Sequence, residues 1–374
     1  MNRTTAQQLL DVLRLRSVAR DQPAPVAWTE QDVRGLVPLL EREGAQVWLY
    51  RRIQQGRVTV PDGLKAALRD AVHRTSVVNM RIDAQTVAVT TLFGSAGIPW
   101  ALLKGQARRA AAKRYPFADA RPVSDVDLLV PDARADEAWQ LLCNQGFRRV
   151  IEEPVDWTAD HHRPTLIDAN NVAVEVHTTT SMTVPPAEAW RRATEHADAV
   201  EWSDKQTCVP NATELVWQAL SHGVADGHTG FVLKAFLSVA AVLAVRPNVD
   251  WSVIAQRTVA CETVDNETHT PVTHERVREF LCVAAWLADV TIPETLQPKH
   301  HVDFATVLMW RSRVLSSGYG RAVKERLLEE AGRVVARQPI TPIVKGAGLL
   351  RNVRRRGSSL VARGLYVAWR STFA

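Results

Sequence analysis

Cysteine is scarce in this chain, and its spacing excludes the common cysteine-based sites. Four cysteines occur in 374 residues, and no two form a Cys-x-x-Cys pair. A zinc knuckle needs such pairs, so that class of metal site is excluded. The wide spacing favours reduced thiols over a disulfide framework. The four are Cys143, Cys208, Cys261 and Cys282.

Long hydrophobic runs are also missing. The longest, residues 231–245, is interrupted by Lys234 and is shorter than the roughly 20 residues that cross a bilayer. It therefore predicts a buried helix. The first residues carry charges in place of the apolar core of a signal peptide. Together with the reduced thiols, these features lead us to expect a cytoplasmic protein.

Acidic residues are absent from the C-terminal segment, residues 331–374. Because this segment carries nine of the basic residues, the first 330 residues have a net charge of −3 within the chain's total of +6. Such a segment is typical of a solvated tail. Its interleaved apolar and basic residues equally fit contact with nucleic acid, an anionic membrane or a partner protein. The basic residues are Arg333, Arg337, Lys345, Arg351, Arg354, Arg355, Arg356, Arg363 and Arg370.

The rest of the chain divides into helical, mixed and helical parts. Apolar residues keep a helical spacing over residues 1–92, with Thr29 as a candidate N-cap and a long helix over 64–93. The expected strands are 98–103, 122–130, 147–152, 166–167 and 172–177, the last two forming a hairpin. The other expected helices are 106–114, 134–145, 211–245, 250–262, 272–290 and 303–337. The resulting divisions are 1–93, 94–204, 205–340 and the tail 341–374.

Two aspartates in the expected strand 122–130 carry the first chemical signal. Side chains alternate between the faces of a strand, so Asp125 and Asp127 share one face. Neighbouring carboxylates repel unless a cation lies between them. Hard oxygen ligands at this spacing suit Mg²⁺ or Mn²⁺. An Asp-x-Asp triplet is a weak motif by itself, so the prediction depends on what accompanies it.

A later strand supplies a third carboxylate. In residues 171–177 the valines alternate with Glu175 and His177, which therefore face the opposite side from the core. An unpaired buried charge is costly, so a Glu in this setting needs a partner. If the two strands are neighbours, Glu175 completes a three-carboxylate cluster that could hold two metals for displacement at phosphorus. His177 is a candidate contact beside them.

A strand–turn–helix passage precedes both strands. Gly105 at this turn would allow close approach of a phosphate, and Lys104, Arg121 and Ser124 could add contacts to a triphosphate. The pair His161-His162 resembles half of a zinc site. No suitable partner spacing follows it, so a polar-loop role is favoured.

In this order, the motifs resemble those of the polymerase-beta-like nucleotidyltransferase superfamily and, more narrowly, the bacterial uncharacterised nucleotidyltransferase family. The matching segments are 102–105, 115–116, 121–130, 146–147, 161–162 and 174–177, with a thinner match after 211. The resemblance implies an α+β fold, in which a small polymerase-beta-like sheet domain is flanked by N-terminal and C-terminal helical regions. It also implies Asp125, Asp127 and Glu175 as metal ligands and Gly105 near the triphosphate.

We therefore expect a magnesium-dependent enzyme that moves a nucleoside monophosphate, with ATP as the expected donor, to a hydroxyl or phosphate of an acceptor. The acceptor would be a small molecule, glycan or peptide natural product, with pyrophosphate released and Glu175 as a candidate base. Two alternatives stay open: a nucleic-acid-directed nucleotidyltransferase that uses the basic tail, and a non-catalytic nucleotide-binding protein. The intact carboxylate trio argues against the second. No feature of the sequence specifies an oligomeric state.

Overall fold

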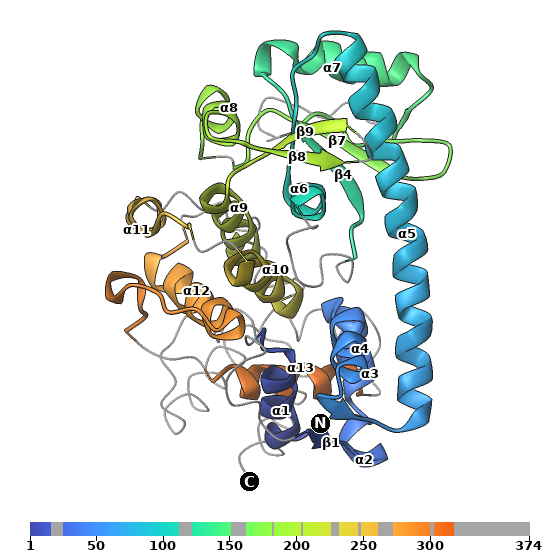
Figure 1. The fold of residues 1–374 in the computed structure, drawn as a ribbon, viewed down its shortest axis with the longest axis vertical. Helices are drawn as coiled ribbons and strands as arrows, with labels where there is room; N and C mark the ends of the chain where they lie inside the picture. Colours follow the sequence, from blue (N-terminus) through green and yellow to red (C-terminus); the bar gives the residue numbers. More distant parts are fainter. Residues whose placement is uncertain are drawn as a thin grey trace, which may run out of the picture.

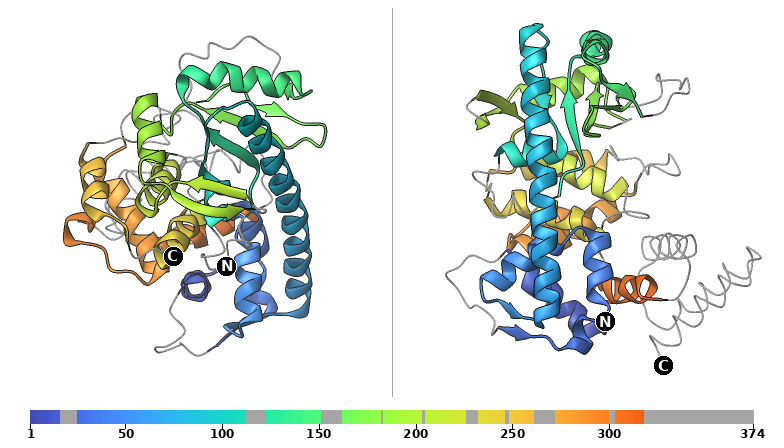
Figure 2. Two further views of the ribbon diagram at one scale, coloured as in Figure 1. Left: turned by 45° about the horizontal axis from the view of Figure 1, so that its top comes forward. Right: turned by 90° about the vertical axis from the view of Figure 1, so that its right-hand side faces the viewer.

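The longest helix that the structure describes, α5 (Asp62–Ser95), connects the two ends of the molecule (Figure 1). Its 34 residues correspond to about 50 Å. It buries Leu64 and Leu68 near its start, and Val89 and Phe93 near its end. The expected long helix is thus confirmed, and it lies beside the N-terminal helices at one end and the main sheet at the other (Figure 2).

This computed structural model describes residues 1–15, 25–111, 122–150, 162–181, 183–202, 205–225, 232–245, 248–260, 272–299 and 303–317. The predicted tail, Arg121, His161 and Cys261 lie outside these residues.

Short helices form the N-terminal part. Thr29 caps one of them as expected, because its side chain accepts the Asp32 N–H and Asp32 bonds back to the Thr29 backbone. The parallel pair of short strands in this part was not predicted. The elements are α1 (Arg3–Leu13), β1 (Val26–Ala27), α2 (Glu30–Val33), α3 (Leu36–Glu43), α4 (Gln46–Gln54) and β2 (Val58–Thr59).

The main sheet has five strands in the order β3-β4-β7-β6-β5. The central pair, β4 and β7, is parallel, and the other neighbours are antiparallel. All five strands were expected; β6 has its predicted bounds, and the other four are shorter than their predicted ranges. The elements are β3 (Ala101–Leu102), α6 (Lys104–Ala110), β4 (Asp125–Leu129), α7 (Asp132–Asn144), β5 (Arg148–Arg149), β6 (Leu166–Ile167) and β7 (Ala173–His177).

Two turns in this region agree with the sequence. Gly146 follows α7 with a φ of 89°, as a glycine after a helix end commonly does. Asn171 has a φ of 58° between β6 and β7, which suits an asparagine in a hairpin turn. The hairpin prediction is therefore confirmed.

A second hairpin was missed. No strand was predicted after residue 177, but after α8 (Pro186–Thr194) come β8 (Asp198–Trp202) and β9 (Lys205–Val209), an antiparallel pair. The inward residue of β8, Val200, is buried between two exposed neighbours. This alternation is short and polar, and so gives only a weak strand signal.

The C-terminal part is helical, as expected. The predicted helix 211–245 is wrong as one unit, because α9 (Ala212–Ala225) and α10 (Val232–Val245) are separate helices that pack together (Figure 1). The others are α11 (Trp251–Val259), α12 (His274–Ala288), the 3₁₀ turn η4 (Glu294–Leu296) and α13 (Phe304–Leu315). Within the described residues, no helix combines the length and apolar character needed to cross a bilayer.

A buried ion pair joins α3 to α13. Glu43 at the end of α3 is fully buried, and its Oε1 lies 2.7 Å from Arg311 Nε in α13. Its Oε2 accepts the Leu233 N–H of α10 at 2.7 Å. One contiguous core cluster includes apolar residues of these helices and of the sheet. The mixed α+β fold with flanking helices is thus confirmed.

Candidate active site

The parallel pairing of β4 with β7 brings two carboxylates together. In the register of these strands, Asp127 lies directly beside Glu175, and Asp125 lies beside Ala173. The alternate residues Val126, Val174 and Val176 are fully buried on the other face. The neighbouring strands and facing carboxylates expected from the sequence are therefore present. Asp127 is 1% exposed at its side chain, and Glu175 is 16% exposed.

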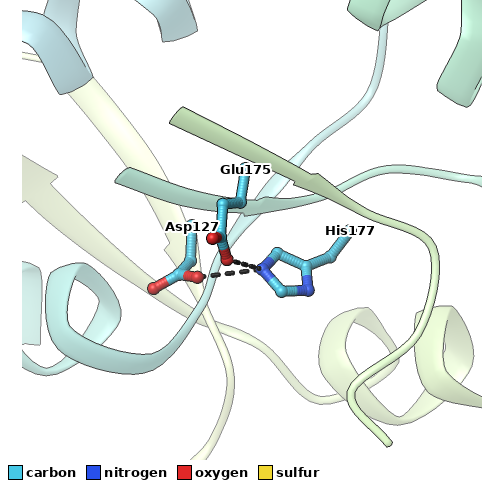
Figure 3. A group of neighbouring side chains, drawn as sticks. All are labelled: Asp127, Glu175 and His177. Atoms are coloured by element: carbon cyan, nitrogen blue, oxygen red, sulfur yellow. Dashed lines mark hydrogen bonds and ion pairs between the residues drawn. The ribbon is translucent and has the colours of Figure 1, made fainter. Parts of the chain in front are cut away.

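His177 completes a three-residue group with these carboxylates (Figure 3). Its Nε2 lies 2.8 Å from Asp127 Oδ1 and 3.3 Å from Glu175 Oε2. Because an ionised carboxylate can only accept, the proton of this hydrogen bond belongs to His177 Nε2. The imidazole is fully buried. It therefore holds both carboxylates in place from the end of β7.

Lys104 brings a cation to the same group. Its Nζ lies 2.8 Å from Asp127 Oδ1 and 3.6 Å from Glu175 Oε2. Burial lowers the pKa of Lys104, but the charges of Asp127 and Glu175 outweigh burial and hold it above its ordinary value. The lysine is therefore charged at any physiological pH.

The two paired carboxylates are ionised for the same reason. Burial raises the pKa of Asp127, but Lys104 and the hydrogen bond from His177 hold it well below its usual range. In Glu175, burial is likewise outweighed, first by His177 and then by Lys104, and its pKa is about 2.

Asp125 has the opposite shift. Burial, followed by the charge of Asp127, raises the pKa of Asp125 to about 6, although Lys104 and a hydrogen bond with Ser124 act against the shift. Asp125 is partly exposed, and it lies outside the group that Asp127, Glu175 and His177 form. Asp125 and Asp127 thus share one face of β4, whereas the compact group of possible ligands consists of Asp127, Glu175 and His177.

Sequence reasoning missed Thr165 as a neighbour of Glu175 and favoured a polar-loop role for His162. The Thr165 hydroxyl donates to Glu175 Oε1 at 3.1 Å. His162 Nε2 lies 4.0 Å from Glu175 Oε2, and the His162 ring meets the His177 ring edge to face at 5.1 Å between centroids. These residues reach the site through the pairing of residues 162–167 with β7. Without that register, nothing in the sequence marks Thr165 or places His162 beside Glu175.

At the turn before α6, the unusual backbone conformation occurs at a different residue from the expected Gly105. Lys104 adopts a φ of 45°, in the left-handed region, whereas Gly105 does not have a positive φ. Gly105 is required for another reason: a Cβ there would lie 3.0 Å from Val123 Cγ1, closer than ordinary packing allows. The glycine therefore lets α6 approach the segment that leads into β4.

Other contacts fix α6 against α5. Gln106 is fully buried and donates to Thr86 Oγ1 at 2.5 Å. Arg109 pairs with Asp83 of the same helix α5. These bonds hold the backbone that carries Lys104. They also give Gln106 a structural position.

The donor set fits a divalent cation. Two cis ligands of one octahedral ion at about 2.1 Å lie about 3 Å apart. The distances of 2.8 and 3.3 Å from His177 Nε2 to the two carboxylate oxygens are close to that value. The three ligand atoms all lie within 4.8 Å of one another. Oxygen and imidazole ligands together suit Mn²⁺ and related ions, and the carboxylates suit Mg²⁺.

Comparison with known proteins agrees with the motifs. The chain matches the family described as uncharacterised nucleotidyltransferase over residues 29–266, which is more than half of its length. No curated protein and no solved structure gives a significant match. The match places the chain in the uncharacterised nucleotidyltransferase family, and the protein is a nucleotidyltransferase.

Proposed function

We propose that this member of the uncharacterised nucleotidyltransferase family transfers AMP from ATP to a hydroxyl or phosphate of a small-molecule, glycan or peptide natural product. One observation carries the proposal: Asp127 and Glu175 lie side by side on parallel strands, with His177 Nε2 between them. This is a rigid anionic site on strands, which suits a reaction whose main demand is placement of a highly charged triphosphate.

Asp127, Glu175 and His177 would hold the cation, with Asp125 beside them as a further carboxylate. A bound Mg²⁺ or Mn²⁺ supplies charge neutralisation at the triphosphate and at the leaving pyrophosphate. Lys104, Gly105, Ser124 and Arg121 are the residues that we assign to nucleotide contact. Of those that the structure describes, Lys104 is the one whose charge lies within the carboxylate group.

Transfer then requires one bond to form and one to break. The acceptor oxygen attacks the α-phosphorus, and the bond to the pyrophosphate oxygen breaks as the leaving group departs in line. Glu175 accepts the acceptor's proton in this proposal, because a carboxylate held by Thr165 and His177 has a fixed orientation. Thr165 acts through Glu175 as a positioning residue.

Asp127→Asn tests the proposal directly. It keeps the shape of the side chain and removes one ligand charge, so release of pyrophosphate from ATP should fall by at least about 100-fold. Mass spectrometry of cell extract incubated with the protein, Mg²⁺ and labelled ATP would identify the acceptor for this assay. The exposed Asp70 in α5 offers a matched control, Asp70→Asn, with unchanged activity. Retained turnover in folded Asp127→Asn protein would contradict the mechanism.

A nucleic-acid-directed reaction is the second candidate. The observation that favours it is the basic segment 331–374, which contains no acidic residue. It predicts RNA binding that weakens steeply with salt and is lost on removal of residues 345–374. Activity on a small acceptor that neither salt nor this deletion changes would exclude it.

A further inference from the structure

Lys104 occupies the place that a divalent cation would need. Its ammonium lies 2.8 Å from Asp127 Oδ1, the same oxygen that accepts the hydrogen bond from His177. It lies 3.6 Å from Glu175 Oε2, on the other strand of the pair. A cation bound to these oxygens at about 2.1 Å would meet the ammonium at a distance where like charges repel strongly.

The backbone conformation of Lys104 is consistent with a functional role for its side chain. A φ of 45° is uncommon for a residue with a Cβ. The preceding residue, Leu103, is tied to β4 by a hydrogen bond from its N–H to the Asp127 carbonyl at 3.0 Å. Lys104 thus enters α6 directly beside the strand that carries Asp127. Strained residues of this kind concentrate at functional sites.

We infer that Lys104 is an internal counterion, displaced from Asp127 and Glu175 when the divalent cation binds and thereby released to pair with the triphosphate of the nucleotide. The inference rests on the proposed function for the identity of the nucleotide. The lysine side chain is 25% exposed, so its end can leave the carboxylates without unfolding its surroundings. Cation and nucleotide then favour each other's binding, since each removes a cost from the other.

A purely structural ion pair makes the opposite prediction for cation affinity. If Lys104 only organised the carboxylates, its removal would let them separate and would weaken cation binding. If it competes with the cation, its removal should strengthen cation binding. The sign of the change therefore separates the two roles.

The first experiment measures Mn²⁺ binding without nucleotide, by the electron paramagnetic resonance signal of free Mn²⁺. We expect Lys104→Met to bind Mn²⁺ about tenfold more tightly than the unchanged protein, because a similar side chain remains without its charge. Lys104→Arg, which keeps the charge, should bind no more tightly than the unchanged protein. Lys65→Met is the matched control, because Lys65 is exposed on α5, and it should change nothing. Equal or weaker binding by folded Lys104→Met would overturn the inference.

The second experiment uses the unchanged protein, so it does not depend on the folding of a variant. Acetylation of Lys104 by a water-soluble acylating reagent is followed by mass spectrometry, with Lys65 as the internal reference. Mg²⁺ should increase labelling of Lys104 several-fold, and Mg²⁺ with a non-hydrolysable ATP analogue should suppress it again. Labelling that Mg²⁺ leaves unchanged or lowers would overturn the inference.

These outcomes are distinct from failure of the proposed function. If neither the unchanged protein nor Lys104→Met bound Mn²⁺ or Mg²⁺, the cation-dependent reaction itself would be refuted. If both bound the cation and Lys104→Met bound it no more tightly, only the counterion role would be lost.

Discussion

Replacing Asp125 with asparagine should stabilise the metal-free protein, although Asp125 lies in the candidate active site. Its pKa is raised from 3.8 to about 6, first by burial and then by the charge of Asp127. A group with a raised folded-state pKa contributes stability that is fully present below its unfolded pKa and is lost as pH rises through the folded value. Above pH 6, ionised Asp125 therefore costs the folded state free energy that a neutral asparagine does not.

The size of this effect follows from the shift. About two pKa units at 1.36 kcal/mol each give up to about 3 kcal/mol. Asp125 is only partly buried, and solvent screening reduces the expected gain of Asp125→Asn to about 1–2 kcal/mol at pH 8. The gain should shrink between pH 6 and pH 4, because Asp125 becomes protonated there in the folded state while it is still largely ionised in the unfolded state.

Urea unfolding in the presence of EDTA, followed by tryptophan fluorescence at pH 4.5 and pH 8, measures this gain. Asp127→Asn provides the contrast, because the lowered pKa of Asp127 means that its ionised form stabilises the folded protein above the unfolded pKa. That variant should lose stability at pH 8. If Asp125→Asn were no more stable than the unchanged protein at pH 8, the charge crowding inferred here would be refuted.

Two further substitutions test the packing that supports the site. Gly105→Ala should lower the free energy of urea unfolding by about 1–3 kcal/mol, because the added Cβ would crowd Val123 Cγ1. Adding Val123→Ala should recover part of the loss, and losses that simply added in the double variant would contradict the proposed crowding. Glu43→Gln should cost about 3–5 kcal/mol, because it removes the charge that Arg311 faces in the buried pair. Glu41 is an exposed neighbour, so Glu41→Gln is the control. If Glu43→Gln and Glu41→Gln had the same thermal unfolding temperature, a stabilising role for the pair of Glu43 and Arg311 would be contradicted.

Local alternation predicted much of the candidate site. The spacing of Asp125 and Asp127, and of Glu175 and His177, assigns each pair to one strand face, and the structure has these faces as expected. Alternation cannot give the register between strands that lie 50 residues apart. It is this register that sets Asp127 beside Glu175 and leaves Asp125 beside Ala173.

The contacts that bend back toward the site could not be predicted for related reasons. His162 and Thr165 reach Glu175 only because residues before β6 pair with β7. The position of the Lys104 ammonium depends on a left-handed backbone conformation that glycine, not lysine, usually marks. The hairpin of β8 and β9 was missed because its strands are short and half polar.

Two features of the site cost the folded protein free energy, and neither has a structural benefit of its own. Asp125 is held beside another carboxylate at the expense of its ionisation, and Lys104 is held in a left-handed conformation. The first cost would be relieved if a cation bound between the carboxylates. Stability given up in this way is typical of a site kept for chemistry. The stabilising effect of Asp125→Asn should therefore diminish in saturating Mn²⁺, because the bound ion supplies positive charge beside the carboxylates. If Mn²⁺ left the gain unchanged, Asp125 would not belong to the cation site.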